Sequence, residues 1–579
     1  MTGGRFGYAA GVIGVALLLG APAALAQLVP PPSAPSKWGA HLDLEGKLGN
    51  ERRLGEGDLF VPLLQNGTSM LFGNIKTRMD DSASFEGNFG LGVRHMLESG
   101  WNLGAYGYFD RRKATFGSYF NQVTTGVEAL SLNWDFRANL YTPEGRRSHL
   151  VDSLNTATLE GTTVVFRGGE ERSLRGFDGE VGYRVPVFAA NEDKQWRVFA
   201  GAYRFYAEGV NAVQGPRLRS EFTIDEVTEL WQGARLTFGA ELQNDGPRGT
   251  QGFLTARLRI PLQVLAGGGS GNAPRLTPME RRMTDPVIRD VDVVSQSGAF
   301  GAPETATATA GGGTLTVASS ATSNGAALQT ALTNAGANST VILSGSFDTA
   351  GNIMTLQSGQ TVMGNGSIAV RSPSGRTAVL TSSTGASVTG NVGGANYTFV
   401  MANNSTLEGL TINNTDTTGN NAQGVRVNGV SNVRILNNTI TATQTGAGTA
   451  HGIDVVGGSS NVTISGNSIT STTTTSISLG IQVIANSSAT ISNNTVTVAG
   501  TSPSTATALG LTTATVTVSG NTFNITAGGG GNKYTVNIGA GATTINSGST
   551  DNVRSTAGTC NNAGTVTGSI SFTNGTTCP

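Results

Sequence analysis

The sequence predicts an all-β protein in two parts: an antiparallel transmembrane β-barrel of about 12 strands, then a right-handed parallel β-helix. Three observations predict it. Residues 37–262 form roughly twelve segments, each near ten residues long, that alternate apolar and polar side chains. Later residues repeat a short phrase with a period in the twenties. Charge is unequal as well: residues 301–579 carry six basic and six acidic side chains, and residues 1–300 carry 31 and 32.

Residues 1–26 have the pattern of a secretory signal peptide. Arg5 gives a positive start, residues 9–19 form an uncharged apolar run, and Ala24-Leu25-Ala26 fits a small-residue cleavage site. The apolar run falls short of the about 20 residues that a spanning helix needs, so an N-terminal anchor is the weaker alternative. We therefore expect export, a short Pro-rich periplasmic segment at 27–36, and no membrane span other than a barrel.

The segment WDFRANLY shows the alternation that predicts the barrel. Trp134, Phe136, Ala138 and Leu140 share one side, and the polar residues between them share the other. An apolar outer face and a charged inner face are typical of a closed barrel in lipid, where no sheet edge is left open. We assign the barrel to 37–263. We expect charged side chains in its lumen that form a network around a threaded linker or, alternatively, a selectivity filter. They are Asp110, Glu128, Asp135, Arg137, Glu180, Arg184, Arg235, Glu241, Arg257 and Arg259.

A series of phrases in this half resembles the β-domain of inverse autotransporters, the intimin/invasin family. In order they are GNFGLGVRHMLESGWNLGAYGYFDRR, NQVTTGVEAL, WDFRANLYTPEG and LRGFDGEVGYRVPV. The resemblance implies a twelve-stranded outer-membrane barrel that exports a C-terminal passenger to the cell surface by type V secretion. It implies contact with outer-membrane lipid, the barrel assembly machinery and periplasmic chaperones. Two departures are that no peptidoglycan-binding module precedes the barrel, and that the passenger lacks the usual immunoglobulin-like or lectin-like modules.

Residues 264–300 are expected to thread the pore. They begin with the flexible run AGGGSGNAP and continue with the charged run RLTPMERRMTDPVIRDVDVV, whose charges suit a polar lumen. At about 3.3 Å per extended residue the segment is long enough to cross a bilayer core of ~30 Å. The alternative is a flexible interdomain linker in the periplasm.

Residues 301–579 are predicted to be the passenger, a parallel β-helix. Asn438, Asn467, Asn494 and Asn521 recur at nearly equal spacing, and so do Gly424, Gly452, Gly480 and Gly510. β-Branched residues alternate around both columns, which predicts three short strands per coil. Asn suits tight corners and forms ladders when stacked. The architecture resembles the pectate-lyase-like superfamily, and the segment NGAALQTAL predicts a short helix over the first coil.

The passenger offers few residues for chemistry. Cys560 and Cys578 are predicted to form a disulfide, since export favours oxidation and a metal site would need further ligands. Arg426, Asp454 and His451 form a possible surface-binding column, with a plain cross-coil ion pair as the alternative. We find no paired carboxylates, catalytic residues, metal site or cofactor motif, and the net charge of -1 does not favour nucleic acid.

The sequence thus predicts an outer-membrane protein that anchors, exports and displays its own passenger at the cell surface. Adhesion is the expected role, and the ligand, on a host, a neighbouring cell or a glycan, is left open. The alternative is a surface polysaccharide lyase or hydrolase on a secretion barrel.

Overall fold

The computed structural model describes residues 37–82, 84–189, 192–227, 229–262, 276–290, 292–390 and 397–579. The predicted signal peptide, the Pro-rich segment and the Gly/Ser-rich start of the linker lie outside these residues. The chain divides into two compact units. One unit ends at 154 and resumes at 169–300, and the other holds 155–168 and 301–579. A short piece of the first half of the chain therefore belongs to the second unit.

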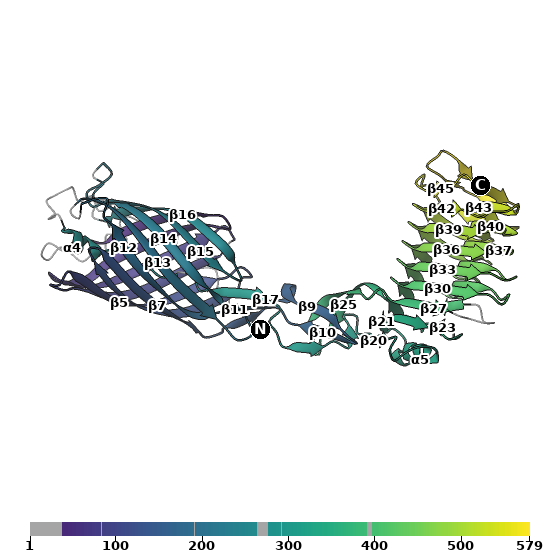
Figure 1. Cartoon of the computed structure of the whole chain (residues 1–579), viewed down its shortest axis with the longest axis horizontal. Coiled ribbons are helices and arrows are strands. Elements are labelled where there is room, and N and C mark those ends of the chain that lie inside the picture. The colour runs from purple at the N-terminus through teal and green to yellow at the C-terminus, as the bar shows by residue number, and fades with distance from the viewer. Residues whose placement is uncertain are drawn as a thin grey trace, which may run out of the picture. The chain divides into compact units, whose positions relative to one another are not determined.

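Twelve antiparallel strands form a closed barrel in the first unit (Figure 1), which confirms the predicted barrel. Strands β1 and β16 close it, and β7 pairs with β12 across a long loop. The strands are β1 (His41–Gly49), β2 (Arg53–Gln65), β3 (Ser69–Asp80), β4 (Phe85–Met96), β5 (Trp101–Lys113), β6 (Tyr119–Ser131), β7 (Trp134–Glu144), β12 (Arg175–Val185), β13 (Lys194–Tyr206), β14 (Val213–Ile224), β15 (Arg235–Asp245) and β16 (Gly249–Pro261).

Sequence alternation decides which side of the barrel wall each side chain faces. On β7, Trp134, Phe136 and Leu140 are about half exposed, while Asp135 and Arg137 between them are buried. The two-residue period of a strand forces this division. Apolar side chains therefore face the lipid and charged ones face the lumen, as in transmembrane barrels generally.

The linker runs through the lumen from one end of the barrel to the other. Its short helix α4 (Pro278–Arg282) starts with a capping box between Thr277 and Glu280. Trp38, just before β1, donates its ring N–H to the Glu280 carbonyl at 2.8 Å. At the other end, Val293 packs against Phe120, beside the turn that joins β5 and β6. The described part of the linker thus spans the barrel length.

The long loop between β7 and β12 contains further short elements. They are β8 (Ser148–Leu150), the 3-10 turn η1 (Asp152–Leu154), β9 (Thr156–Glu160), β10 (Thr163–Arg167) and β11 (Glu170–Ser173). Within the first unit, β11 pairs with β8 and with the linker strand β17 (Ser295–Gly298). The hairpin β9–β10 belongs instead to the second unit. The predicted barrel range 37–263 therefore contains a segment whose strands pair with the passenger, because the loop is long enough to carry a hairpin of its own.

The second unit is a parallel β-solenoid with three sheets, which confirms the predicted β-helix architecture (Figure 1). Sheet A comprises β20 (Leu315–Ser319), β21 (Thr340–Ser344), β24 (Thr361–Met363), β29 (Thr406–Glu408), β32 (Arg434–Leu436), β35 (Val462–Ser465), β38 (Ser488–Ser492), β41 (Thr515–Ser519), β44 (Ala542–Ile545) and β47 (Thr565–Thr567). Sheet B comprises β22 (Ser346–Asp348), β27 (Ser387–Gly390), β30 (Thr411–Asp416), β33 (Thr439–Gln444), β36 (Ser468–Thr473), β39 (Thr495–Gly500), β42 (Thr522–Ile525) and β45 (Val553–Arg554).

Sheet C is the third face of the solenoid. It comprises β23 (Met354–Thr355), β28 (Tyr397–Val400), β31 (Ala422–Asn428), β34 (Ala450–Val456), β37 (Ile477–Ile484), β40 (Thr505–Thr512), β43 (Asn532–Ile538) and β46 (Thr559–Asn562).

A further sheet of six strands, which we call the base sheet, has the order β18-β10-β9-β26-β25-β19. Its passenger strands are β18 (Pro303–Thr305), β19 (Ala308–Thr309), β25 (Asn365–Arg371) and β26 (Thr377–Ser383). The last pair is β48 (Ile570–Ser571) and β49 (Thr577–Cys578).

Stacked apolar side chains fill the solenoid. Ile453 of one coil lies in register with Val425 before it and Ile481 after it, and all three are buried.

The predicted column of Gly424, Gly452, Gly480 and Gly510 differs from the structure in its last member. Because Ile481 pairs with Leu509, the residue that follows Gly480 in the stack is Ala508 and not Gly510. The 28-residue step is therefore retained, and Gly510 lies beside Gln482 on the outer face.

The asparagine column forms a buried ladder at one corner. Asn467 donates to the Asn494 side chain at 2.9 Å, accepts from the Asn438 backbone N–H at 2.9 Å, and donates to the Ile435 carbonyl at 2.8 Å. Asn494 and Asn521 repeat the pattern, and Asn552 continues it. Each amide thus satisfies backbone groups that a tight corner would leave without partners.

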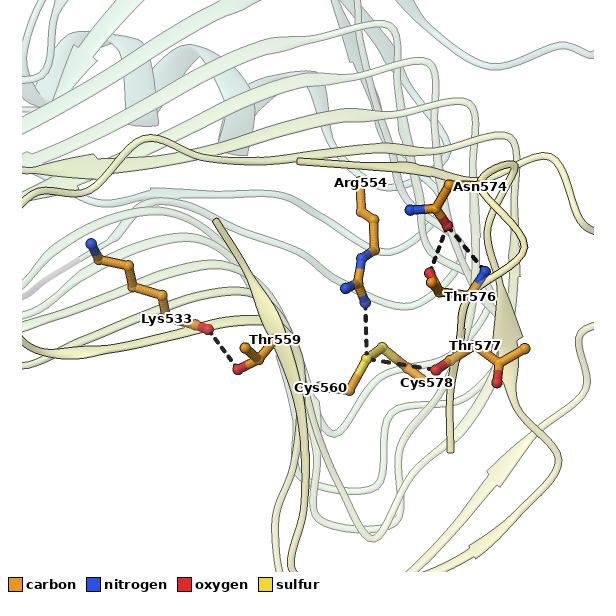
Figure 2. The surroundings of a disulfide bond; sticks show 8 residues. All are labelled: Lys533, Arg554, Thr559, Cys560, Asn574, Thr576, Thr577 and Cys578. Atoms are coloured by element: carbon orange, nitrogen blue, oxygen red, sulfur yellow. Dashed lines mark hydrogen bonds between the residues drawn. A yellow bond between two sulfur atoms is a disulfide. The ribbon is translucent and has the colours of Figure 1, made fainter. Parts of the chain in front are cut away.

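Both ends of the solenoid core are covered. Helix α5 (Ala326–Ala335) buries Leu328 and Leu332 in the same core as the first coils. At the C-terminal end a disulfide joins Cys560 on β46 to Cys578 on β49 (Figure 2). None of the helices among the described residues is long and apolar enough to cross a bilayer.

Candidate functional site

The linker is held in the lumen by buried ion pairs. Each pair joins one charged linker residue to one residue of the barrel wall at 2.7–3.1 Å: Arg282 to Asp135, Asp285 to Arg235, Arg289 to Asp110, and Asp292 to Arg78. Charges taken out of water are tolerated when they are paired in this way, and removing one partner leaves a costly unpaired charge. The wall and the linker are therefore complementary.

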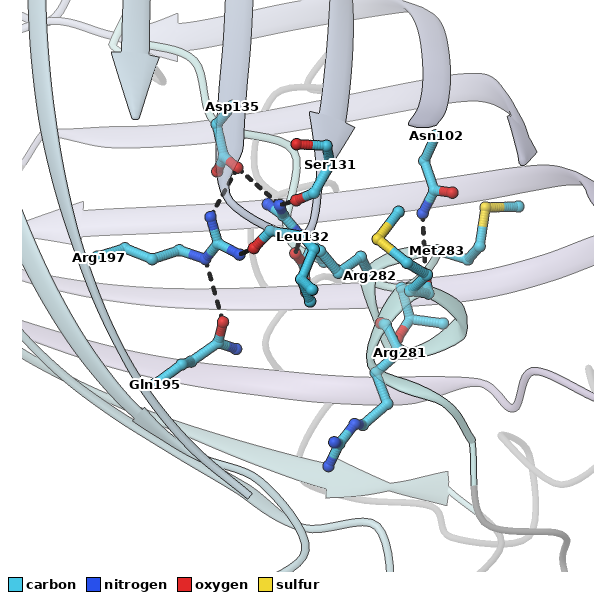
Figure 3. Close-up of polar contacts among 12 residues, drawn as sticks. Asn102, Ser131, Leu132, Asp135, Gln195, Arg197, Arg281, Arg282 and Met283 are labelled. Carbon is cyan, nitrogen blue, oxygen red and sulfur yellow. Dashed lines mark hydrogen bonds and ion pairs between the residues drawn. The ribbon is translucent and has the colours of Figure 1, made fainter. Parts of the chain in front are cut away.

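Asp135 illustrates how wall and linker share one carboxylate (Figure 3). Arg197 of β13 and Arg282 of α4 both approach its Oδ1, at 2.9 and 2.7 Å. Asn102 of β5 donates to the Met279 carbonyl at 3.0 Å, so α4 is also held through its backbone. Arginine suits this task because its planar guanidinium donates in several directions at once.

The ten residues expected in the lumen have different roles. Asp110, Asp135 and Arg235 pair with the linker directly, as above. Arg259 donates to linker residue Thr284, and Glu128 orients Arg94, which donates to the carbonyls of Met283 and Asp285. Pairs within the wall are formed by Arg137 with Glu180 and by Arg257 with Glu45. Glu241 lines a cavity in the lumen together with Glu45 and Arg257.

Arg184 differs from the expectation for the lumen. It lies near the end of β12, is partly exposed, and donates to Asn133 and to the Phe188 carbonyl rather than to the linker. The strand ends there, so its side chain turns to the adjacent loops. Residues that sequence reasoning missed include Lys76, which donates to the Val287 carbonyl at 2.9 Å, and Arg78. Both lie on the polar side of β3, so the same alternation could have found them.

The outer face of sheet C carries a cluster of polar residues at its N-terminal end. Arg426 and Asp454 lie in register on β31 and β34, and both point outward, because Val425, Val427, Ile453 and Val455 point inward. His451 Nδ1 lies 3.8 Å from Asp454 Oδ1. We call Tyr397, Gln423, Arg426, His451 and Asp454 the polar column. The structure thus brings the three sequence-predicted residues together.

Tyr397, which sequence reasoning missed, completes this arrangement. The Arg426 guanidinium lies over its ring, 4.6 Å from the centroid, as in cation–π pairs. Burial, and then the negative charge of Asp454, raise the pKa of the Tyr397 hydroxyl. Tyr397 lies outside the repeated phrases, so no sequence signal placed it there.

Several buried atoms of the polar column have no hydrogen-bond partner among the described residues. They are Gln423 Oε1, Arg426 Nε, His451 Nδ1 and Asp454 Oδ1. Asp454 is only 6% exposed and Gln423 only 4%. Buried polar groups are normally satisfied, and the lumen holds further atoms without a partner, but these four lie in one cluster beneath the partly exposed Arg426 and His451.

Sheet B presents a different outer face, an uncharged array of hydroxyls. Its outward positions hold the registered rows Thr439-Ser468-Thr495-Thr522 and Thr441-Thr470-Thr497-Asn524. These side chains point out because Ile440, Ile469, Val496 and Phe523 between them point in. The array is regular and polar, and it contains none of the unpartnered buried groups that distinguish the polar column.

Among the described residues, no group of three or more His, Cys, Asp or Glu side chains is placed to hold a metal ion.

The barrel and the solenoid each match a known protein family. Residues 33–222 match the family described as inverse autotransporter, beta-domain. The barrel is an inverse autotransporter β-domain. Residues 339–528, which cover most of the solenoid, match a family described as a protein of unknown function, DUF1565.

Solved structures similar to part of the chain include two autotransporter domains and a porin. The β-domain of the Bordetella autotransporter BrkA is 10% identical over 38% of this chain and 98% of its own, with a TM-score of 0.21. The translocator domain of the autotransporter NalP from Neisseria meningitidis is 10% identical over 43% and 94%, with a TM-score of 0.18. The NanC porin is 10% identical over 38% and 98%, with a TM-score of 0.23. None of the curated proteins compared with the chain matches it.

The family match and the fold place the chain in the outer membrane, in contact with lipid through the barrel's apolar outer face. The solenoid is its passenger domain.

Proposed function

We propose that the inverse autotransporter β-domain exports the solenoid to the cell surface, where the solenoid acts as an adhesin. The complementary lumen supports the export step, because the described part of the linker runs along the pore and pairs with its wall. The barrel assembly machinery and periplasmic chaperones would deliver such a barrel to the membrane.

The polar column supports the adhesion step, and it carries the proposal. Adhesion needs groups that a ligand can reach and that gain from binding. The column offers the partly exposed side chains of Tyr397, Arg426 and His451 in one patch, with a buried carboxylate and a buried amide beneath them. A sugar supplies neutral hydroxyls that both donate and accept, and its ring can stack on an aromatic side chain, so it can contact Arg426, His451 and Tyr397 together. We therefore assign the column to a glycan.

We propose binding rather than catalysis at this site. Acid and base cleavage of a glycosidic bond uses two carboxylates placed about 5–10 Å apart. Within the described part of the polar column, Asp454 is the single carboxylate. The alternative of a polysaccharide lyase or hydrolase would require glycan depolymerisation that is lost on Asp454→Ala.

The test is glycan binding by the full chain purified in detergent, probed on an array of bacterial and host glycans. Asp454→Asn and Arg426→Met are expected to weaken binding about tenfold or more, because Arg426 contacts the ligand and the Asp454 charge lies beneath it, next to His451. Thr470→Val, on the hydroxyl face of sheet B, is the matched control. Equal loss with Thr470→Val, or no glycan bound by the native chain, would contradict the proposal.

A further inference from the structure

The hairpin β9–β10 is connected at both ends to barrel strands along the chain, but it packs in the passenger. Residue 155 follows β7 and η1, and residue 168 leads into β11 and β12, yet 155–168 forms part of the second unit. The turn between β9 and β10 has two residues, and Gly161 at its first position has φ +63°, which suits a tight hairpin. A well-formed element of the barrel loop is thus available to the passenger.

Both backbone edges of the hairpin are paired with passenger strands. On one edge, β10 pairs antiparallel with β18, Val165 opposite Thr305. On the other edge, β9 pairs parallel with β26, Ala157 opposite Leu380. Asn155 also donates to the Thr377 carbonyl at 2.9 Å. The hairpin therefore sits in the middle of the base sheet and joins two passenger segments that are about 70 residues apart in the chain.

The hairpin also supplies part of a hydrophobic core. Phe166 is completely buried, and Val164 is 2% exposed. They pack in one cluster with Ile342 of β21 and Met363 of β24. Val341 precedes Ile342 and Val362 precedes Met363, and both valines point the other way, into the solenoid interior. The base sheet thus covers the outer face of the first strands of sheet A, which would otherwise expose apolar side chains.

The order of the strands along the chain suggests which contacts of the hairpin form first. The first passenger strand after the linker is β18, which begins five residues after β17 ends. Its partner β10 comes earlier in the chain and is joined to barrel strands at both ends of the loop. Parallel coils are slow to nucleate, because their contacts join residues far apart in the chain. A hairpin edge supplied from the barrel loop would remove part of that difficulty for the first coil, and later coils then have a template in the coil before them.

We propose that the β9–β10 hairpin is a folding template, which binds the first segments of the passenger as they leave the pore and starts the solenoid. The proposal rests on export of the passenger by the barrel. Its partner is this chain's own residues 303–305 and 377–383, recognised through two β edges and the apolar side chains Ala157, Val164 and Phe166.

The test uses the full chain in cells, with an epitope tag after Gly548. Two quantities are followed after induction: labelling of the tag on intact cells, and the fraction of passenger that resists added protease. With Phe166→Asp we expect normal labelling but about tenfold or more slower gain of protease resistance. Thr158→Asp, an exposed residue of the same hairpin, is the control and should behave as the native chain. Heat-modifiable gel mobility checks that the barrel has assembled.

A cysteine pair separates templating from late docking. Val165→Cys with Thr305→Cys places two thiols on directly opposed residues, where a disulfide fits. Cross-linked peptides found by mass spectrometry before protease resistance develops would support the template. Cross-linking only after resistance is complete, or native folding kinetics in Phe166→Asp, would overturn it. A native chain whose tag is never labelled on intact cells would instead refute export.

Discussion

Arg289 of the linker lies 3.1 Å from Asp110 of β5, and neither side chain has any exposed surface. The Arg289 guanidinium also lies over the Tyr108 ring, 4.1 Å from its centroid. A charged linker residue is thus enclosed by the barrel wall at a depth where only a paired charge is stable. The lumen of this barrel is built to hold its linker.

Removing one partner of this pair should loosen the linker. Arg289→Met leaves the Asp110 charge buried without its cation, which costs about 3–5 kcal/mol. We expect ion conductance in planar bilayers to rise, because the linker leaves the pore more often. Arg184→Met, at the strand end and without linker contact, is the control. Adding Asp110→Asn to Arg289→Met should bring conductance back towards the native level, and a native conductance in Arg289→Met alone would argue against a linker plug.

The asparagine ladder should dominate the stability of the coils. Asn467→Ala leaves the Asn438 N–H and the Ile435 carbonyl without partners, at about 1–3 kcal/mol for each group. Asn524→Ala, on the outer face of sheet B, should cost less than about 0.5 kcal/mol. Pulse proteolysis of the passenger in increasing urea measures both. Similar losses for the two variants would show that the ladder is not a special stabilising feature.

The disulfide should protect the C-terminal end of the solenoid. Cys560 and Cys578 are 18 residues apart, and closing a loop of that length stabilises by about 3 kcal/mol. Replacing both by serine should let the last coils open and become cleavable near residue 560, while earlier coils stay resistant. Limited proteolysis with mass spectrometry checks this. Unchanged cleavage would mean that the stacked core alone holds the end in place.

Acid should weaken the passenger through Asp416. Burial raises the pKa of this carboxyl, but the backbone N–H of Thr418 and the amide of Gln444 donate to it, and the net pKa is lowered. A lowered pKa stabilises the fold above the ordinary value of 3.8, and this contribution is lost as the pH falls below it. Asp416→Asn should therefore be less stable than the native chain at pH 6, with a smaller difference at pH 3. Urea unfolding at the two pH values measures the difference, and a constant difference would contradict the assignment.

Much of the architecture could be predicted because it follows from local periodicity. The alternation around Trp134 and Phe136 determines which side chains face the lipid, and the spacing of Asn438, Asn467 and Asn494 determines the coil length. The lumen pairs were predictable as a class but not as partners. Which wall residue meets Arg289 depends on how the linker lies in the pore, and the linker has no repeat.

Other features depend on contacts that leave no pattern in the sequence. Phe166 of β10 lies opposite Glu304 of β18. The sequence around either strand does not show that the two strands pair. Tyr397 reaches Arg426 only because β28 and β31 are neighbours in sheet C. The assignment of Gly510 failed for a related reason: spacing alone could not show that Ala508 takes the inward position and that Gly510, two residues later, lies on the outer face.

The most direct measurement is protease treatment of intact cells that carry an epitope tag after Gly548, an exposed site in the last coils. We predict that the tag is labelled and removed from outside, while a periplasmic marker stays intact. A tag protected until the outer membrane is broken would leave the solenoid in the periplasm. That result would contradict export and display of the passenger.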